Sequence, residues 1–223
     1  MEVGALKQGL DGAQIDGGWY VAVTKFAEQT GWMHGIVLAY TDVLGLGLFA
    51  LLLLACWWTA RSASTRTMTA ALWAPVAIVL AYLVNDVIKI IVAEPRPCQQ
   101  IPHVVTLITC EAPGDYSFPS NHAAISGALA VAVLLVHRRL GVVAVVAALA
   151  MGASRIYVGS HYPHDVVAGL LIGGLVAALT GSLAIRMLSG VVDTLRTSRM
   201  QPVLTAGHRR EHTASDQDRA DSQ

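Results

Sequence analysis

Long apolar blocks alternate with short polar segments over most of this chain of 223 residues. A helix needs about 20 apolar residues to cross the hydrocarbon core of a bilayer. Five blocks reach or approach that length: 36–58, 70–93, 123–137, 140–158 and 165–188. The third block is the shortest. It spans only if its helix also includes Ser120, Asn121 and His122, so we expect these polar residues at the membrane edge.

The two ends of the chain differ from these blocks. Residues 14–33 mix Trp19 and Phe26 with Glu28, a pattern typical of a helix in the membrane interface. From about residue 190 the sequence turns polar and predicts a disordered tail. The predicted fold is all-α, a polytopic membrane helix bundle of about five spans preceded by an interfacial helix. Its expected parts are 1–33, 34–189 and 190–223.

Composition agrees with a membrane protein. Hydrophobic residues make up 54% of the chain and charged residues 13%, whereas a soluble domain carries about 25% charged residues. The formal net charge is zero, and no basic run is present. The expected partner is therefore the bilayer and not a nucleic acid.

Arginine positions predict how the bundle is oriented, because basic residues gather in cytoplasmic loops. Ten of the fifteen lysines and arginines follow the first, third and fifth blocks. With those regions in the cytoplasm, the C-terminus is inside, and segments 94–122 and 154–165 meet at the outer face. Arginine outnumbers lysine twelve to three, which points to a bacterium, so the expected location is a bacterial plasma membrane.

Three cations lie near outer helix ends in this topology: Lys89, Arg96 and Arg155. Ionisable groups at such depth are costly and mark functional sites. Phosphate fits three converging cations best, because guanidinium groups match its oxygens in pairs and lysine adds a point charge.

Two histidines and a carboxylate complete this set. His161 and Asp165 are four residues apart, so one helical turn brings the carboxylate beside the imidazole. The carboxylate would fix the tautomer and leave the other ring nitrogen free to attack. His122 suits a general acid for the leaving oxygen. A helix that begins near Ser120 would also aim backbone N–H groups at an anion.

These residues form three motifs, which occur in the order Lys89-x6-Arg96-Pro97, Pro119-Ser120-Asn121-His122 and Ser154-Arg155-x5-His161-x3-Asp165. Together they resemble the motifs of the type-2 phosphatidic acid phosphatase superfamily, over roughly residues 35–188. One departure is Asn121, where many members have Gly or Asp.

The resemblance implies a role for each matching residue. His161 would attack phosphorus and form a phosphohistidine, Asp165 would orient it, and His122 would protonate the leaving group and then activate water. The phosphoryl oxygens would be bound by Lys89, Arg96 and Arg155, helped by Ser120, Asn121 and Ser154. Neither a metal nor another cofactor is expected.

Two strings, SFPSNH and SRIYVGSHYPHDVVAG, look most like the bacitracin-resistance type of undecaprenyl pyrophosphate phosphatase. This resemblance implies hydrolysis of the terminal phosphate of a polyprenyl pyrophosphate, which recycles the carrier lipid of cell-wall synthesis. Phosphatidic acid, phosphatidylglycerophosphate and other prenyl phosphates stay open as substrates. The alternative of another class is a non-catalytic protein that binds lipid headgroups. It predicts loss of a catalytic histidine or aspartate, and all three are present.

Two further features lie close to these motifs. Cys98 and Cys110 share the outer segment, where an oxidising compartment allows a disulfide, and two free thiols are the alternative. His164 stands beside Asp165 but outside the motifs, and we expect a solvated loop histidine there.

Overall fold

The computed structural model describes residues 10–206, and every regular element in that part of the chain is helical, as predicted. The elements are α1 (Gly12–Gln29), the 3₁₀ helix η1 (Gly31–Met33), α2 (His34–Ala39), the π-helix η2 (Tyr40–Leu44), α3 (Gly45–Ala60), α4 (Thr65–Val92), α5 (Pro97–Gln100), α6 (Asn121–Val136), α7 (Arg138–Tyr157), α8 (Pro163–Arg196) and α9 (Gln201–Leu204).

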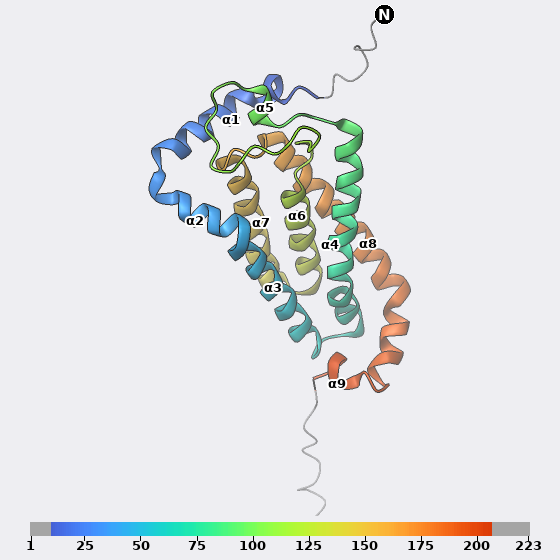
Figure 1. The fold of residues 1–223 in the computed structure, drawn as a ribbon. Coiled ribbons are helices and arrows are strands. Elements are labelled where there is room, and N and C mark those ends of the chain that lie inside the picture. The colour runs from blue at the N-terminus through green and yellow to red at the C-terminus, as the bar shows by residue number, and fades with distance from the viewer. Residues whose placement is uncertain (1–9, 207–223) are drawn as a thin grey trace, which may run out of the picture.

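Four stretches of the described residues are long and apolar enough to cross a membrane: Gly31–Ala60, Thr65–Gln100, Arg138–Tyr157 and Pro163–Arg196. The expected third block is α6, which has 16 residues and begins at Asn121. At 1.5 Å per residue this helix is about 24 Å long, shorter than the hydrocarbon core. It packs against α4, α7 and α8, so the longer helices surround it (Figure 1).

Small residues let α6 and α8 approach closely. A Cβ atom added at Gly173 would collide with the backbone carbonyl of Ala124, and one added at Gly127 would collide with the backbone of Leu170. This contact aligns the N-terminal ends of the two helices. There, the backbone N–H of Ser120 donates to the carbonyl oxygen of Asp165 at 3.1 Å.

Helix α1 lies across one end of the bundle (Figure 1), where it contacts α5, α7 and α8. Tyr20 is fully buried against the bundle, and its hydroxyl donates to the carbonyl oxygen of Gly159 at 2.9 Å. Trp19 and Phe26 are exposed on the opposite side. With this distribution of apolar surface, a place in the membrane interface stays the prediction for α1.

The C-terminal part corrects one expectation. Helix α8 continues to Arg196 and α9 follows, so the prediction of a disordered tail from residue 190 is wrong for its first part. The reason is that the Arg196 guanidinium donates to the carbonyl oxygens of Arg61, Ala63 and Leu204, which ties α9 to the α3–α4 turn. The rest of the predicted tail, 207–223, lies outside the described residues.

Candidate active site

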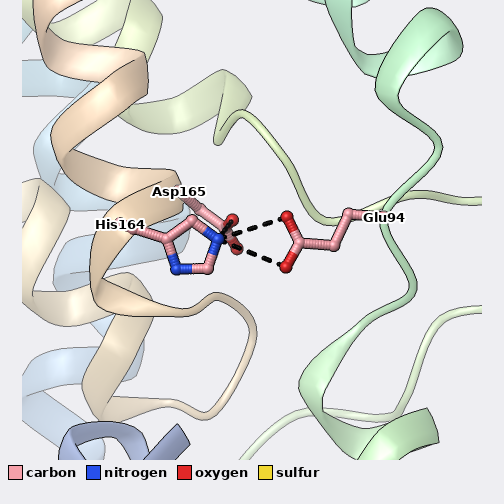
Figure 2. Close-up of side chains that lie close together, drawn as sticks. All are labelled: Glu94, His164 and Asp165. Atoms are coloured by element: carbon pink, nitrogen blue, oxygen red, sulfur yellow. Dashed lines mark hydrogen bonds and ion pairs between the residues drawn. The ribbon is translucent and has the colours of Figure 1, made fainter. Parts of the chain in front are cut away.

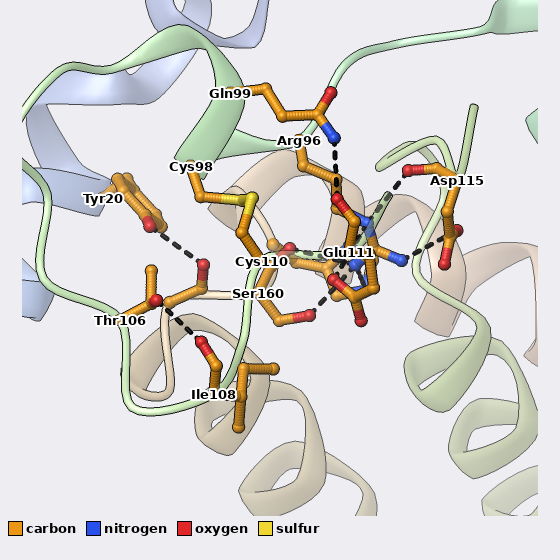
Figure 3. The surroundings of a disulfide bond; sticks show 12 residues. Tyr20, Arg96, Cys98, Gln99, Thr106, Ile108, Cys110, Glu111, Asp115 and Ser160 are labelled. Carbon is orange, nitrogen blue, oxygen red and sulfur yellow. Dashed lines mark hydrogen bonds and ion pairs between the residues drawn. A yellow bond between two sulfur atoms is a disulfide. The ribbon is translucent and has the colours of Figure 1, made fainter. Parts of the chain in front are cut away.

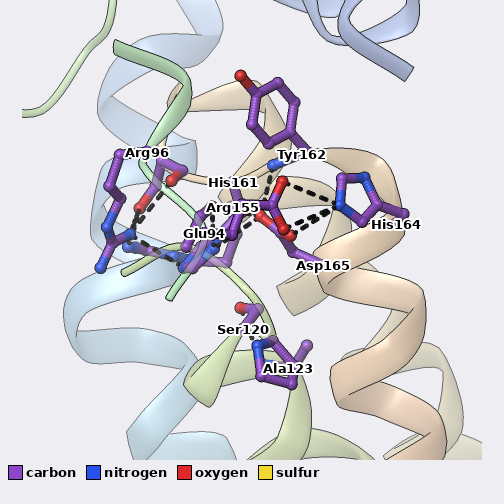
Figure 4. Close-up of polar contacts among 12 residues, drawn as sticks. Glu94, Arg96, Ser120, Ala123, Arg155, His161, Tyr162, His164 and Asp165 are labelled. Atoms are coloured by element: carbon purple, nitrogen blue, oxygen red, sulfur yellow. Dashed lines mark hydrogen bonds and ion pairs between the residues drawn. The ribbon is translucent and has the colours of Figure 1, made fainter. Parts of the chain in front are cut away.

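Five of the predicted site residues converge at the end of the bundle that α1 covers. All five side chains are buried, and they are Lys89, Arg96, Arg155, His161 and Asp165. Figure 4 shows Arg96 and Arg155 reaching toward His161 from one side while Asp165 approaches it from the other.

These side chains lie at helix ends and in turns. Lys89 occupies the last turn of α4, which stops at Ala93 in a left-handed conformation with φ of 53°. Arg96 occupies the N-cap position of the short helix α5, without a capping hydrogen bond from its side chain. Arg155 lies in the last turn of α7. A turn through Gly159, with φ of 83°, then leads the chain to His161.

His161 lies between a carboxylate and a guanidinium. Its Nδ1 atom is 3.3 Å from Oδ2 of Asp165, and its Nε2 atom is 3.2 Å from NH1 of Arg96. The same Oδ2 accepts hydrogen bonds from the hydroxyl of Ser117 and from the backbone N–H of Tyr162. A ring nitrogen that faces a carboxylate carries the proton, so Nε2 presents its lone pair to Arg96.

The surroundings of His161 keep its imidazole neutral. Burial, followed by the positive charges of Arg96 and Lys89, lowers the pKa of His161 well below its ordinary value. A neutral imidazole with a fixed tautomer is a nucleophile, whereas an imidazolium is not.

Loop carboxylates lie beside two of the three cations, Arg96 and Lys89. NH2 of Arg96 lies 2.9 Å from Oδ1 of Asp115, and Nε of Arg96 lies 3.5 Å from Oε2 of Glu111. The ammonium of Lys89 donates to the carbonyl oxygen of Tyr116 at 2.8 Å and lies 4.0 Å from Asp115. Asp115 is about half exposed, with a side-chain exposure of 48%. A phosphate that bound these cations would therefore replace oxygen ligands already present.

Ser160 joins the two arginines. Its hydroxyl oxygen accepts from NH1 of Arg96 at 3.0 Å and from NH2 of Arg155 at 2.9 Å. Arg155 also donates to the hydroxyl of Thr41, which belongs to the π-helix η2. π-Helical turns within α-helices are frequent at functional sites.

His122 lines a hollow that also reaches Thr41, the hydrogen-bond partner of Arg155. His122 is an exposed residue in the first turn of α6. The hollow of about 120 Å³ is also lined by residues of η2, α3 and α7, among them Asp42, Phe49 and Met151.

The three smaller residues predicted to bind phosphate have other contacts. Ser120 caps α6 through the N–H of Ala123, and the side-chain oxygen of Asn121 accepts from Asn85 at 2.6 Å. The hydroxyl of Ser154 donates to the carbonyl oxygen of Met151 within α7 at 2.7 Å. The role of Ser154 as a phosphate ligand therefore stays a prediction, and it would require the hydroxyl to exchange this partner for a phosphate oxygen.

A disulfide fastens the loop that follows α5. Cys98 and Cys110 are bonded, and the bond joins α5 to the loop that carries Glu111 and Asp115 (Figure 3). Gln99 adds a hydrogen bond to the carbonyl oxygen of Glu111 at 3.1 Å. The loop carboxylates are therefore fastened beside Arg96.

Comparison with known families identifies the fold. The family model of the PAP2 superfamily matches residues 70–187, which is more than half of the chain. The chain belongs to the PAP2 superfamily.

Similar PAP2 proteins come from several organisms. The chain is 35% identical over 129 residues to the bacitracin transport permease protein BcrC of Bacillus licheniformis, covering 58% of this chain and 62% of that protein. It is 36% identical over 132 residues to the undecaprenyl-diphosphatase BcrC of Bacillus subtilis, covering 59% and 65%. An undecaprenyl-diphosphatase of Sulfolobus acidocaldarius is 33% identical over 116 residues, covering 52% and 55%. The matches therefore span less than two thirds of each relative's own length.

A solved structure shows the same fold. The transmembrane PAP2-type phosphatidylglycerolphosphate phosphatase of Bacillus subtilis superposes with a TM-score of 0.55 at 23% identity, covering 76% of this chain and 86% of that one. Together with the long apolar helices, this likeness makes the chain a multi-pass membrane protein.

Sequence reasoning missed several residues of this PAP2 site. Ser117 contacts both His161 and Asp165, and Ser160 links the arginines. Ser117 lies two residues before the second motif, and Ser160 is an unspecified position within the third, directly before His161. Their only sequence signal is a hydroxyl group close to motif residues. Thr41 carries no such signal, because it reaches Arg155 from a distant helix.

The expectation for His164 is wrong. It is not a solvated loop residue but the second residue of α8, and its ring lies among carboxylates. Figure 2 shows its ring facing Glu94 and Asp165. Among the described residues, Glu94, His164 and Asp165 also form the one group whose ligand atoms lie close enough, within 4.8 Å, to hold a metal ion. The sequence hid this cluster because Glu94 comes from a segment far from His164 and Asp165.

Proposed function

We propose that this PAP2 protein is an integral membrane phosphatase that removes the terminal phosphate of undecaprenyl pyrophosphate, or a similar polyprenyl pyrophosphate, through a phosphohistidine on His161. The observation that carries the proposal is the position of His161 between the Asp165 carboxylate and the Arg96 guanidinium. In this position Nε2 lies within an anion-binding group while Nδ1 is fixed by a carboxylate.

The reaction has two steps. Nε2 of His161 attacks the terminal phosphorus, the bond to the bridging oxygen breaks, and His122 gives that oxygen a proton. Water then attacks the phosphohistidine while His122 takes a proton from it, and inorganic phosphate leaves. The lipid keeps one phosphate.

The cations would stabilise the charge that develops on the transferred phosphoryl group. Lys89, Arg96 and Arg155 are buried, so their interaction with an anion is stronger than in water. Ser120 and Asn121 would contribute through the N-terminal end of α6, whose first N–H groups point outward. The contact of Ser154 with Met151 favours a supporting role for Ser154 in α7.

The hollow beside His122 suits a lipid. His122 lines the hollow formed with apolar residues of α3 and α7, so a leaving group that reaches the acid is in contact with membrane-facing helices. The names of the B. subtilis and S. acidocaldarius relatives favour a polyprenyl pyrophosphate. If α6 also spans, the bundle has five spans. With the arginine-rich turns in the cytoplasm, the site would then face outward, and the enzyme would recycle the carrier lipid of peptidoglycan synthesis there.

Phosphate release from purified protein tests the activity. The panel is undecaprenyl pyrophosphate, farnesyl pyrophosphate, phosphatidic acid and phosphatidylglycerophosphate, and we expect the first to give the highest kcat/KM. His161→Ala should abolish release, whereas His103→Asn, at an exposed position with φ of 59°, should not. Unchanged phosphate release by His161→Ala would contradict the mechanism. A non-catalytic lipid-binding protein would release no phosphate, either as wild type or as any variant.

A pair of single cysteines tests the orientation. In a Cys56→Ala background, the Cys98–Cys110 disulfide leaves no other cysteine to react. His103→Cys lies at the site end of the bundle and Ser62→Cys in the α3–α4 turn, and both positions are exposed. An impermeant thiol reagent should label only His103→Cys in intact cells. The reverse pattern would place the site inside and remove the carrier-recycling role.

A further inference from the structure

His164 joins Asp165 to two carboxylates, Asp16 and Glu94, that the proposed reaction does not use. Its Nδ1 atom lies 2.8 Å from Oδ1 of Asp16, and its backbone N–H donates to the other oxygen of the same carboxylate at 2.7 Å. On the other side of the ring, Nε2 lies 3.2 Å from Glu94 and 3.3 Å from Oδ1 of Asp165. Asp16 belongs to α1 and Glu94 to the segment after α4, so the ring joins three separate parts of the chain.

The contacts favour protons on both ring nitrogens, because each nitrogen faces a carboxylate. A neutral imidazole has one N–H donor, and its other nitrogen would present a lone pair to a carboxylate. An imidazolium donates from both nitrogens and supplies a positive charge. The ring is also stacked between Phe118 and Tyr162, with centroid distances of 5.8 Å and 5.6 Å. Aromatic faces favour a cation between them.

His164 is also the counter-ion of otherwise unpartnered carboxylate oxygens. Asp165 and Glu94 are fully buried. Within residues 10–206, Oδ1 of Asp165 and Oε1 of Glu94 have no hydrogen-bond partner, and the cationic group within 4 Å of each is Nε2 of His164. Buried carboxylate oxygens without a donor are costly, so loss of the charge on His164 would disturb Asp165 directly.

The N-terminal helix is shaped for this contact. Asp16 has non-helical backbone angles, φ −147° and ψ 24°, inside α1. One turn earlier, Gly12 packs so closely on Glu94 and Tyr162 that a Cβ atom would collide with both. Asp16 and Gly12 lie outside residues 70–187, the part that matches the PAP2 family.

We propose that His164 is a positively charged positioning residue that couples the docking of α1, through Asp16, to the orientation of Asp165 and hence of His161. Asp165 is then held by two histidines. Its Oδ2 atom faces His161 and its Oδ1 atom faces His164. Undocking of α1 would release Asp16, loosen His164 and leave Asp165 without its counter-ion. The proposal rests on the proposed function in one respect, because the effect on turnover requires Asp165 to orient the nucleophile.

The closing experiment combines kinetics with hydrogen exchange on the full-length protein in nanodiscs. His164→Gln keeps polar atoms but no charge, and His164→Arg restores a planar cation. In His164→Gln we expect kcat to fall about tenfold with KM nearly unchanged, since the nucleophile is misaligned while the phosphate-binding cations remain. Without its counter-ion Asp165 takes up a proton more readily, so the acid limb of kcat/KM should move up by about one pH unit. His164→Arg should recover most of both effects.

Hydrogen exchange reports the link to α1. Amides of 12–29 should exchange faster in His164→Gln and in Asp16→Asn, and the double variant should add little to either. Normal kcat and an unmoved pH profile with faster exchange would reduce His164 to a structural residue and overturn the proposal. Loss of activity with 1,10-phenanthroline and its recovery with Zn²⁺ would show that the cluster binds a metal, which also overturns it. If wild-type protein cleaves no lipid phosphate, the proposed function fails, and the exchange data still test whether His164 holds α1.

Discussion

NH1 of Arg96 lies 3.2 Å from Nε2 of His161, the ring nitrogen that attacks phosphorus in the proposed reaction. The same NH1 also donates to the hydroxyl of Ser160 at 3.0 Å, and NH2 binds Asp115 at 2.9 Å. The guanidinium therefore covers the nucleophile before substrate binds. A phosphoryl group that takes these donors would be drawn onto Nε2.

Arg96→Lys tests whether turnover needs the several N–H donors of the guanidinium or only its positive charge. Lysine keeps the charge but cannot hold Ser160, Asp115 and a phosphoryl oxygen together. We expect kcat/KM to fall about 100-fold, or about 2.7 kcal/mol in transition-state stabilisation. Steady-state phosphate release at several lipid concentrations measures it. A variant that retains wild-type kcat/KM would show that the contact between Arg96 and His161 has no part in turnover.

Asp115→Asn tests whether the loop carboxylate competes with substrate. Asp115 pairs with Arg96 and lies 4.0 Å from Lys89, so it occupies oxygen positions that a phosphate would take. Removing its charge should strengthen anion binding. We expect KM and the inhibition constant of inorganic phosphate both to fall about threefold to tenfold. The opposite change in both constants would mean that Asp115 orders the cations for substrate instead.

The acid side of the pH profile follows from the burial of His161. Its pKa lies well below the value of about 6.5 for an unfolded histidine, because of burial first and of Arg96, Lys89, Arg155 and His122 after it. His161 therefore stays neutral at pH 6.5, and the loss of kcat/KM from its protonation should begin only at lower pH. Phosphate release between pH 4 and pH 8 measures this limb.

The same shift affects stability, with a definite sign. Below about pH 6.5 the unfolded chain binds a proton at His161 that the folded chain does not, so stability falls as the pH is lowered toward the folded pKa. His161→Asn should remove this part of the slope of Tm against pH. An identical slope in the variant would show that His161 has the same pKa in both states.

The sequence predicted residues that the fold brings together at this site, but not the residues that contact and orient them. Motifs on helix ends could be recognised because Lys89, Arg96, Arg155, His161 and Asp165 are polar residues in apolar surroundings, and the bundle then brings them together. Ser117, Ser160 and Thr41 could not be recognised, since a hydroxyl residue has no distinctive spacing and its partner depends on three-dimensional packing.

The prediction that His164 is a solvated loop residue failed for a related reason. One charged side chain in a polar segment is usually solvated, and only the docking of α1 brings Asp16 to it. The extension of α8 to Arg196 was equally hidden, because its cause is a set of carbonyl oxygens in the α3–α4 turn and in α9. Local patterns predict helices, whereas contacts between distant segments decide where they end.

The disulfide should stabilise the lid, meaning the loop 101–115 that brings Glu111 and Asp115 to Arg96. In the chain-entropy model, closing a loop with a separation of 12 residues contributes about 2–3 kcal/mol. The Cys98→Ser/Cys110→Ser double variant should therefore have a lower Tm, faster proteolysis within 101–109 and a lower kcat/KM, because Arg96 lies two residues from Cys98. Reductant should produce these changes in wild-type protein and none in the double variant. Equal Tm and equal proteolysis with and without the bond would show that the lid is held by its other contacts alone.

Two glycines of α8 provide a matched test of how closely α6 and α8 must pack. A Cβ at Gly173 would collide with the carbonyl of Ala124, whereas one at Gly190 meets nothing within 4 Å. Gly190→Ala should stabilise the protein by about 0.5–1 kcal/mol through helix propensity. Gly173→Ala gains the same propensity but must push α8 away from α6, so we expect a net loss of about 1–3 kcal/mol. Moving α8 away from α6 would also lengthen the contact of 3.1 Å between the backbone N–H of Ser120 and the carbonyl oxygen of Asp165. We therefore expect kcat to fall in Gly173→Ala and not in Gly190→Ala.

Thermal unfolding in detergent measures the stability of both variants, and phosphate release on the same samples measures kcat. Equal behaviour of the two variants would show that the close contact contributes neither stability nor alignment.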